Sequence, residues 1–156
     1  MGTVDIRRAT PDDAETLLGF VRALAEYERE PDAVEATASV LAGQLAAEVP
    51  PFECLIASLD GDDVGMAIFF PTYSTWRAKI GIHLEDLWVE PRARRHGVAR
   101  ALMDELGRIV IARGGARLEW RVLTWNEPAI RFYRSLGAEP LDGWDTWRLD
   151  LAARMT

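Results

Sequence analysis

The chain has 156 residues, of which 25 are acidic and 18 are basic, so its formal net charge is −7. This length predicts a single domain over residues 1–156, because domains average roughly 150 residues and a chain of this size can bury its own core. The acidic balance argues against a nucleic-acid-binding protein, whose phosphate contacts favour a basic surface.

Hydrophobic periodicity, capping residues and turn signals predict the elements in chain order. Thr10 and Pro11 open the first helix, and Gly114 and Gly115 end the longest one. Pro71 ends a strand, and a polar loop follows it at 72–78. The predicted strands are 3–8, 52–59, 64–70, 80–89, 117–122, 138–141 and 144–151, and the predicted helices are 11–27, 37–48, 97–113 and 126–136.

This order of strands and helices predicts an α/β (α+β) fold with a mixed central sheet flanked by helices. The single cysteine, Cys54, excludes an intramolecular disulfide, and its apolar neighbours indicate a buried structural thiol. With two histidines in the chain we expect no metal site. We find no signal-peptide or membrane-spanning segment and therefore expect a cytoplasmic protein without a membrane partner.

A basic loop, residues 92–97, joins the strand that ends at Val89 to the longest helix. The first turn of a helix has backbone N–H groups without intrahelical partners, and these groups attract anions. Gly97 and Ala99 lack bulk, so a phosphate can approach the backbone closely. Four arginines add positive charge: Arg92, Arg94, Arg95 and Arg100. The segment predicts a phosphate site, with a solvated basic loop as the alternative.

The spacing of this loop fits neither the P-loop nor the glycine-rich dinucleotide motif. Arg94-x-x-Gly97-x-Ala99 instead resembles the Q/R-x-x-G-x-G/A signature of the GNAT acetyltransferase superfamily. Val89-Glu90-Pro91 and Asn126-Glu127-Pro128-Ala129-x-x-Phe132-Tyr133-x-x-x-Gly137 are also similar to that superfamily. The resemblance covers nearly the whole chain and implies a mostly antiparallel central sheet and acetyl-CoA as co-substrate.

Further segments resemble the spermidine/spermine (diamine) and thialysine acetyltransferase branch: Ala25-Glu26-Tyr27-Glu28, Tyr73-x-x-Trp76, Leu84-Glu85-Asp86-Leu87 and Trp125-Asn126-Glu127-Pro128. This resemblance implies acetyl transfer to the primary amine of a small cationic acceptor: a diamine, a polyamine or a thialysine- or lysine-like amine. It also implies a homodimer, with the last two strands as the contact. Two alternatives stay open: a protein, peptide or aminoglycoside acceptor, and a non-catalytic CoA-binding module.

The resemblance also implies the roles of individual residues. An alkylamine has a pKa of about 10.4 and must lose a proton before it attacks a thioester. Glu85 would take that proton, directly or through water. Tyr133 would protonate the departing CoA thiolate. The cofactor-binding set is Leu87, Trp88, Val89, Arg94, Arg95, His96, Gly97, Val98, Ala99, Arg100, Asn126, Glu127, Pro128 and Ala129. The substrate-binding set is Tyr27, Glu28, Trp76, Glu85, Glu119, Trp120 and Arg121.

Three further residues bear on the phosphate loop and on the acceptor site. Arg95 stands where polyamine members of the branch commonly have glycine, so a side chain lies at the mouth of the phosphate loop. Arg121 would either repel a second ammonium group or bind a carboxylate, which favours an amino-acid-like amine. Asp86 should point to the opposite face of an ideal strand from Glu85, and we expect it to be structural or electrostatic.

Overall fold

A five-stranded mixed sheet organises the first part of the computed structural model, which describes residues 2–152. The strands follow one another in chain order across the sheet: β1 (Val4–Arg8), β2 (Glu53–Leu59), β3 (Asp62–Ser74), β4 (Lys79–Val89) and β5 (Arg117–Trp120). Neighbouring strands from β1 to β4 are antiparallel, and β5 runs parallel to β4. The predicted α/β class with a mixed, mostly antiparallel sheet is confirmed.

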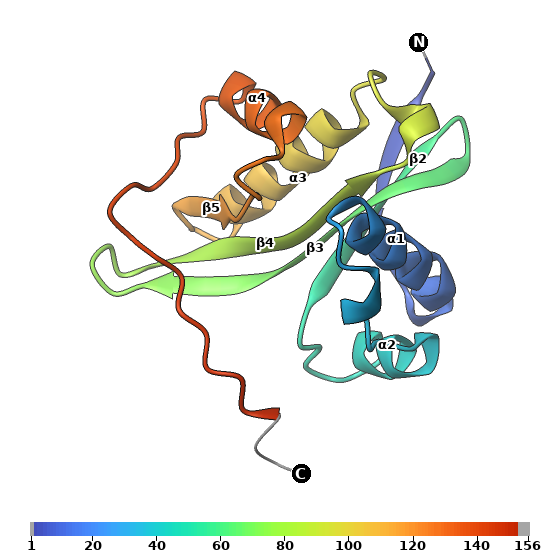
Figure 1. Ribbon diagram of the computed structural model, residues 1–156, viewed down its shortest axis with the longest axis horizontal. Coiled ribbons are helices and arrows are strands. Elements are labelled where there is room, and N and C mark those ends of the chain that lie inside the picture. The colour runs from blue at the N-terminus through green and yellow to red at the C-terminus, as the bar shows by residue number, and fades with distance from the viewer. Residues whose placement is uncertain (1, 153–156) are drawn as a thin grey trace. The chain divides into compact units, whose positions relative to one another are not determined.

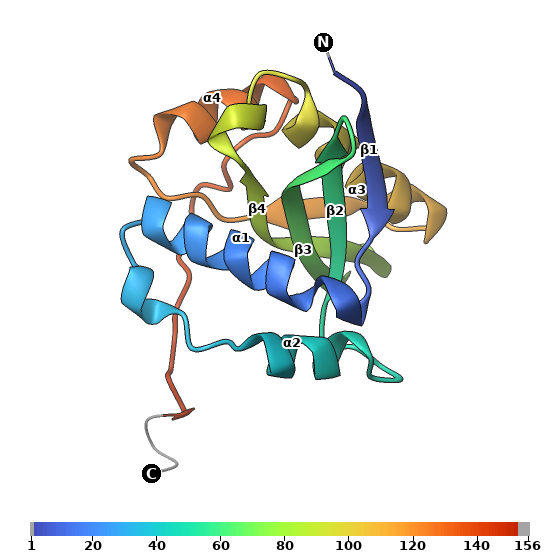
Figure 2. The ribbon, with the colours of Figure 1, turned by 90° about the vertical axis from the view of Figure 1, so that its right-hand side faces the viewer.

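Helices cover both faces of this sheet, as Figures 1 and 2 show. Helices α1 (Ala14–Tyr27) and α2 (Ala38–Leu45) lie on one face, and α3 (Val98–Ala112) lies on the other. Leu17 and Phe20 of α1 pack in one core cluster with Ile56, Met66 and Trp88 of the strands. Burial of these apolar side chains fixes α1 against β2, β3 and β4.

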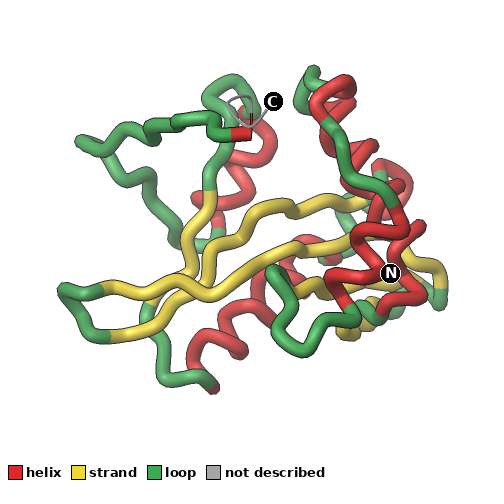
Figure 3. Tube along the Cα trace, turned by 90° about the horizontal axis from the view of Figure 1, so that it is seen from below, coloured by secondary structure: helices red, strands yellow, loops and turns green. Residues whose placement is uncertain are grey.

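The strand β3 is longer than predicted, because Pro71 does not end it. Pro71 lies opposite Ile82 of β4, and pairing continues to Ser74 opposite Lys79. Pairing of β3 with β2 has already ended at Phe69, so at Pro71 the other side of β3 is an edge. A proline without an N–H group is tolerated at such an edge. The resulting β3–β4 hairpin extends beyond the other strands of the sheet (Figure 3).

The chain divides into two compact units, Met1–Arg121 and Val122–Thr156. The second unit contains α4 (Glu127–Ser135), which begins as predicted after Asn126, whose Oδ1 accepts a hydrogen bond from the Ala129 N–H at 3.4 Å. The helix ends as predicted before Gly137, whose φ of +88° is the left-handed conformation that glycine adopts readily. Among the described residues, no helix is long and apolar enough to cross a membrane.

The strands predicted at 138–141 and 144–151 are wrong: the structure forms no strand over 138–152. Trp144 is 73% exposed and Trp147 is 91% exposed. Alternation of apolar residues indicates a strand only where a neighbouring strand is present to satisfy the backbone N–H and C=O groups. The predicted homodimer contact through these strands therefore loses the elements on which it depended.

Candidate active site

The basic loop leads into α3 through two left-handed residues. Gly97 has a φ of +79° and precedes the helix, and no side-chain hydrogen bond caps it. The first intrahelical bond runs from the Ala101 N–H to the Gly97 carbonyl at 2.9 Å, so the N–H groups before Ala101 lack intrahelical acceptors. Arg95 has a φ of +66°, a conformation in which a side chain is strained.

Two buried polar atoms in or beside this loop have no hydrogen-bond partner within the described part of the chain: His96 Nδ1 and Trp88 Nε1. Both residues belong to the predicted cofactor-binding set. Buried polar atoms are almost always paired, so an orphaned atom indicates a group that is absent. The helix N-terminus, the cationic side chains and the orphaned atoms together fit a phosphate-bearing ligand such as CoA.

Arg94 is exposed, but its side chain folds back from this loop onto the sheet. Its Nε donates a hydrogen bond to the Val89 carbonyl at 3.1 Å. Its guanidinium carbon lies 5.1 Å from the Trp88 ring centroid and 5.7 Å from that of Tyr27, within cation–π range. Arg94 therefore joins the phosphate loop to the end of α1, and the structure brings together residues predicted for the two different substrates.

The end of β4 has one free edge. Pairing with β5 stops at Leu84 opposite Trp120, whereas pairing with β3 continues to Val89 opposite Gly65. Between Glu85 and Val89, β4 therefore has no second neighbouring strand in the described sheet. Backbone groups on this edge, in the segment of the predicted cofactor residues Leu87 and Trp88, remain available to an extended ligand, whereas the Val89 carbonyl already accepts from Arg94.

A bulge in β4 changes the expected orientation of Asp86. Ile68 lies opposite Asp86 and Phe69 lies opposite Leu84, so Glu85 is an extra residue in the ladder. His83, opposite Phe70, is thereby on the same face as Asp86, because Phe70 and Ile68 are two residues apart in one strand. Glu85 hydrogen-bonds His83 and lies on this face too. The prediction that Asp86 and Glu85 point to opposite faces is wrong.

Three carboxyl groups meet on this face of the sheet. Burial, reinforced by the negative charges of Glu85 and Glu28, raises the pKa of Asp86 to about 6. Burial also raises the pKa of Glu28, the residue that follows α1. Carboxylates held together away from water bind a cation favourably, because the cation relieves both the repulsion and the lost hydration. Asp86 is thus a candidate site residue that sequence reasoning missed, since no residue type marks the bulge.

Both oxygens of the Glu85 carboxylate have a cationic or donor neighbour. His83 Nε2 lies 3.1 Å from Oε2, and Arg121 Nη2 lies 3.8 Å from Oε1. The β5 residue Glu119 is opposite His83 and lies 3.9 Å from Arg117. The structure therefore brings together Glu85, Glu119 and Arg121, three of the predicted substrate residues, along β4 and β5.

Not all predicted substrate residues lie together. Tyr27 packs beside Trp88, with ring centroids 6.1 Å apart, next to Glu28. Trp76 is 87% exposed at the tip of the β3–β4 hairpin, which projects away from α1 (Figures 1 and 3). The structure does not bring Trp76 to Tyr27 and Glu28.

The remaining predicted residues belong to the second unit. Tyr133 lies half-buried on α4, with its ring centroid 5.4 Å from that of Phe132. Asn126 is 9% exposed and caps the same helix. The helix therefore presents Tyr133 at a defined position in the unit, with Glu127, Pro128 and Ala129 in its first turn.

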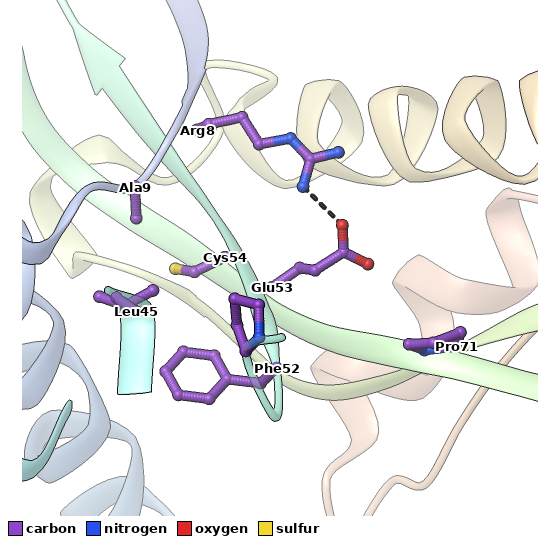
Figure 4. Close-up of a pocket in the computed structure, with 8 residues that line it drawn as sticks. Arg8, Ala9, Leu45, Phe52, Glu53, Cys54 and Pro71 are labelled. Atoms are coloured by element: carbon purple, nitrogen blue, oxygen red, sulfur yellow. Dashed lines mark hydrogen bonds and ion pairs between the residues drawn. The ribbon is translucent and has the colours of Figure 1, made fainter. Parts of the chain in front are cut away.

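A cavity of about 310 Å³ lies apart from these groups, at the ends of β1 and β2 (Figure 4). Its lining residues are Arg8, Ala9, Leu45, Pro50, Phe52, Glu53, Cys54 and Pro71. Glu53 pairs with Arg8 at 2.7 Å and with Arg113 at 2.6 Å, so its negative charge is compensated there. Burial raises the pKa of the Cys54 thiol to about 12, which agrees with the predicted structural role and opposes a nucleophilic one.

No group of three or more His, Cys, Asp or Glu side chains among residues 2–152 is arranged to hold a metal ion.

The model of the acetyltransferase (GNAT) family matches residues 17–138. The chain belongs to this family, and it is an N-acetyltransferase, as its motifs predicted.

The chain is similar to proteins of the predicted branch. The chain is 37% identical to the thialysine N-epsilon-acetyltransferase of Caenorhabditis elegans, over 98% of this chain and 96% of that protein. It is 30% identical to the spermidine/spermine N(1)-acetyltransferase-like protein 1 of Homo sapiens, over 96% of this chain and 22% of that protein. The solved structure of an integron cassette protein from the mobile metagenome of V. cholerae has a TM-score of 0.78 at 25% identity, covering 94% and 92% of the two chains.

Proposed function

We propose that this protein transfers an acetyl group from acetyl-CoA to the primary amine of a small cationic acceptor. The observation that carries the proposal is the electrostatic coupling of Asp86 with Glu85 on β4 and with Glu28 after α1, in a chain whose helix α3 begins without a side-chain cap after a basic loop. The first site suits an ammonium group and the second suits the phosphates of CoA. The negative carboxylates and the positive helix N-terminus match two substrates of opposite charge.

The chain's own residues would hold the co-substrate, which supplies the acetyl thioester. Backbone N–H groups at Val98, Ala99 and Arg100, with the Arg95 side chain, would bind the pyrophosphate. The free edge of β4 at Leu87, Trp88 and Val89 would bind the pantetheine arm, and one of its N–H groups would stabilise the oxyanion. Residues Asn126 to Ala129 would contact the rest of CoA. The proposal treats residues 1–156 as one functional domain.

Glu85 and Tyr133 would handle the two protons of the reaction. The acceptor arrives as an ammonium ion, and Glu85 takes a proton from its nitrogen, directly or through water. The nitrogen then forms a bond to the acetyl carbon, the carbon–sulfur bond breaks as the oxyanion collapses, and the nitrogen loses its second proton to water to give the neutral amide. Tyr133 gives its phenolic proton to the departing sulfur, since a phenol is protonated at neutral pH and a thiolate is a competent acceptor.

Arg121 favours an acceptor that carries a carboxylate. Its guanidinium lies 3.8 Å from Glu85 and its side chain is half exposed, so it would repel the second ammonium group of a polyamine. A thialysine- or lysine-like amine presents a carboxylate to Arg121 and its side-chain amine to Glu85. Glu119 and Trp120 lie in β5, directly before Arg121. We also infer a homodimer in the cytoplasm, as the branch resemblance and the reduced, buried thiol favour.

The experiment is an acceptor panel. The purified protein is incubated with acetyl-CoA and with thialysine, lysine, ornithine, spermidine, spermine, an aminoglycoside or a lysine peptide, and CoA release is followed. We expect release with the amino-acid-like amines and a larger kcat/KM for them than for spermidine. Acetyl-CoA binding by calorimetry without release on any acceptor would reject the proposal in favour of a binding module.

A further inference from the structure

His83 on β4 lies within hydrogen-bond distance of Glu85, and its position is fixed on two sides. Its ring lies against Phe70, with centroids 5.0 Å apart and an angle of 32° between the planes. Its Nε2 lies 3.1 Å from Oε2 of Glu85. Its side chain is 21% exposed, whereas that of Glu85 is 40% exposed. The imidazole is thus the less exposed of the two groups, and it restrains the more exposed carboxylate.

The direction of this hydrogen bond follows from the groups involved. An ionised carboxylate only accepts hydrogen bonds, so Nε2 carries the hydrogen and donates a hydrogen bond to Oε2. The bulge leaves Glu85 without a partner in the ladder, and the side chain needs another constraint. The Arg121 guanidinium is 3.8 Å from Oε1, which is too long for a hydrogen bond. Oε1 therefore stays available to an N–H group of the acceptor.

The charged groups around His83 come from two strands. Glu85 and Asp86 lie on its own strand, and Glu119, opposite His83 on β5, pairs with Arg117. Arg121 lies on the far side of Glu85. His83 is therefore the donor that lies against Oε2, and Arg121 is the cation on the side of Oε1.

We propose that His83 is the positioning residue for the proton-accepting carboxylate of Glu85. This inference rests on the proposed function, in which Glu85 takes the proton of the acceptor amine. His83 acts through Glu85: its Nε2–H fixes Oε2, and the geometry directs Oε1 to the substrate.

Two isosteric substitutions separate this role from a packing role. In His83→Gln the amide nitrogen reaches the place of Nε2 and retains a donor that does not titrate. In His83→Asn the amide is one bond shorter and does not reach Glu85. We expect His83→Asn to lower kcat about tenfold with an unchanged KM for acetyl-CoA, and His83→Gln to recover most of kcat.

Equal kcat in His83→Asn and wild type, or equal losses in both variants, would overturn the inference. Melting temperature and acetyl-CoA binding are measured for each variant, and His83→Phe, which keeps a ring on Phe70, replaces His83→Asn if that variant is unfolded. Glu85→Gln separates the role of His83 from the role of Glu85 itself. A large loss in Glu85→Gln with no effect at His83 rejects this inference alone, whereas full activity in Glu85→Gln rejects the role of Glu85 in the proposed function.

Discussion

Ile68 of β3 lies directly opposite Asp86 of β4, although the next pair along the ladder joins Phe69 to Leu84 and leaves Glu85 out. One residue of difference between two strands turns a pair of adjacent carboxylates toward the same face. The repulsion between them is part of what raises the pKa of Asp86 to about 6. The bulge is therefore the structural origin of the acidic site.

We expect Asp86→Asn to raise the free energy of unfolding and to raise the KM for the amine. The pKa of Asp86 is raised from 3.8 to about 6, so the native state loses stability as the pH rises through this interval and the carboxyl ionises. We expect Asp86→Asn to raise the free energy of unfolding by up to about 3 kcal/mol at pH 7.5 and by little at pH 4. The KM for the amine should rise about tenfold or more, because an ammonium partner is lost.

Thermal denaturation at the two pH values and steady-state kinetics check this prediction. Equal changes in melting temperature at pH 4 and pH 7.5 would contradict the role of ionisation. An unchanged KM for the amine would remove Asp86 from the acceptor site.

Arg95→Gly should relieve backbone strain at the phosphate loop. Arg95 has a φ of +66°, where a side chain costs roughly 1 kcal/mol that glycine does not. The greater freedom of glycine in the unfolded chain offsets part of the gain, so we expect a stabilisation below about 1 kcal/mol. Loss of the cation should weaken acetyl-CoA binding several-fold in calorimetry. Arg95→Ala is the matched control: it should weaken binding equally without stabilising the fold.

Tyr133→Phe removes the proposed proton donor and keeps the ring beside Phe132. General-acid catalysis contributes about a hundredfold or more, so we expect kcat to fall by about that factor while the KM values for both substrates change little. Steady-state kinetics on the best acceptor of the panel measure this effect, and acetyl-CoA calorimetry confirms that the variant is folded. A kcat within twofold of wild type would exclude Tyr133 as the acid.

Glu53→Gln should destabilise the fold and leave catalysis unaffected. Hydrogen bonds from Arg113 at 2.6 and 2.9 Å and from Arg8 at 2.7 Å lower the pKa of Glu53. A lowered carboxyl pKa contributes stability at neutral pH that is lost as the pH falls through the folded-state value. We expect a loss of about 1–2 kcal/mol at pH 7 and a smaller loss at pH 3, by denaturant titration.

The control for this variant is Glu105→Gln. Glu105 pairs with Arg108 one turn away on the surface of α3. Such an exposed helical pair contributes little, so Glu105→Gln should unfold like the wild type. A similar loss in both variants would mean that the network around Glu53 has no special weight.

Local sequence determined much of this protein. The basic loop before α3, the Asn126 cap with Pro128 in the first turn of α4, and the left-handed Gly97 and Gly137 depend on neighbouring residues only, and all were predictable. The family motifs are local for the same reason, because a helix N-terminus that binds phosphate is built from consecutive residues.

Only the tertiary structure decided what depends on pairing between distant segments. The extension of β3 through Pro71 requires that β2 has already ended, and the bulge at Glu85 exists only in the register between β3 and β4. Arg113 reaches Glu53 across 60 residues of sequence. The residues around Trp144 carry a strand pattern but form no strand, since a strand's backbone groups need a neighbour that sequence alternation does not supply. The net charge of −7 thus says nothing of the pair of carboxylates, Glu85 and Asp86, that the strand register turns to one face.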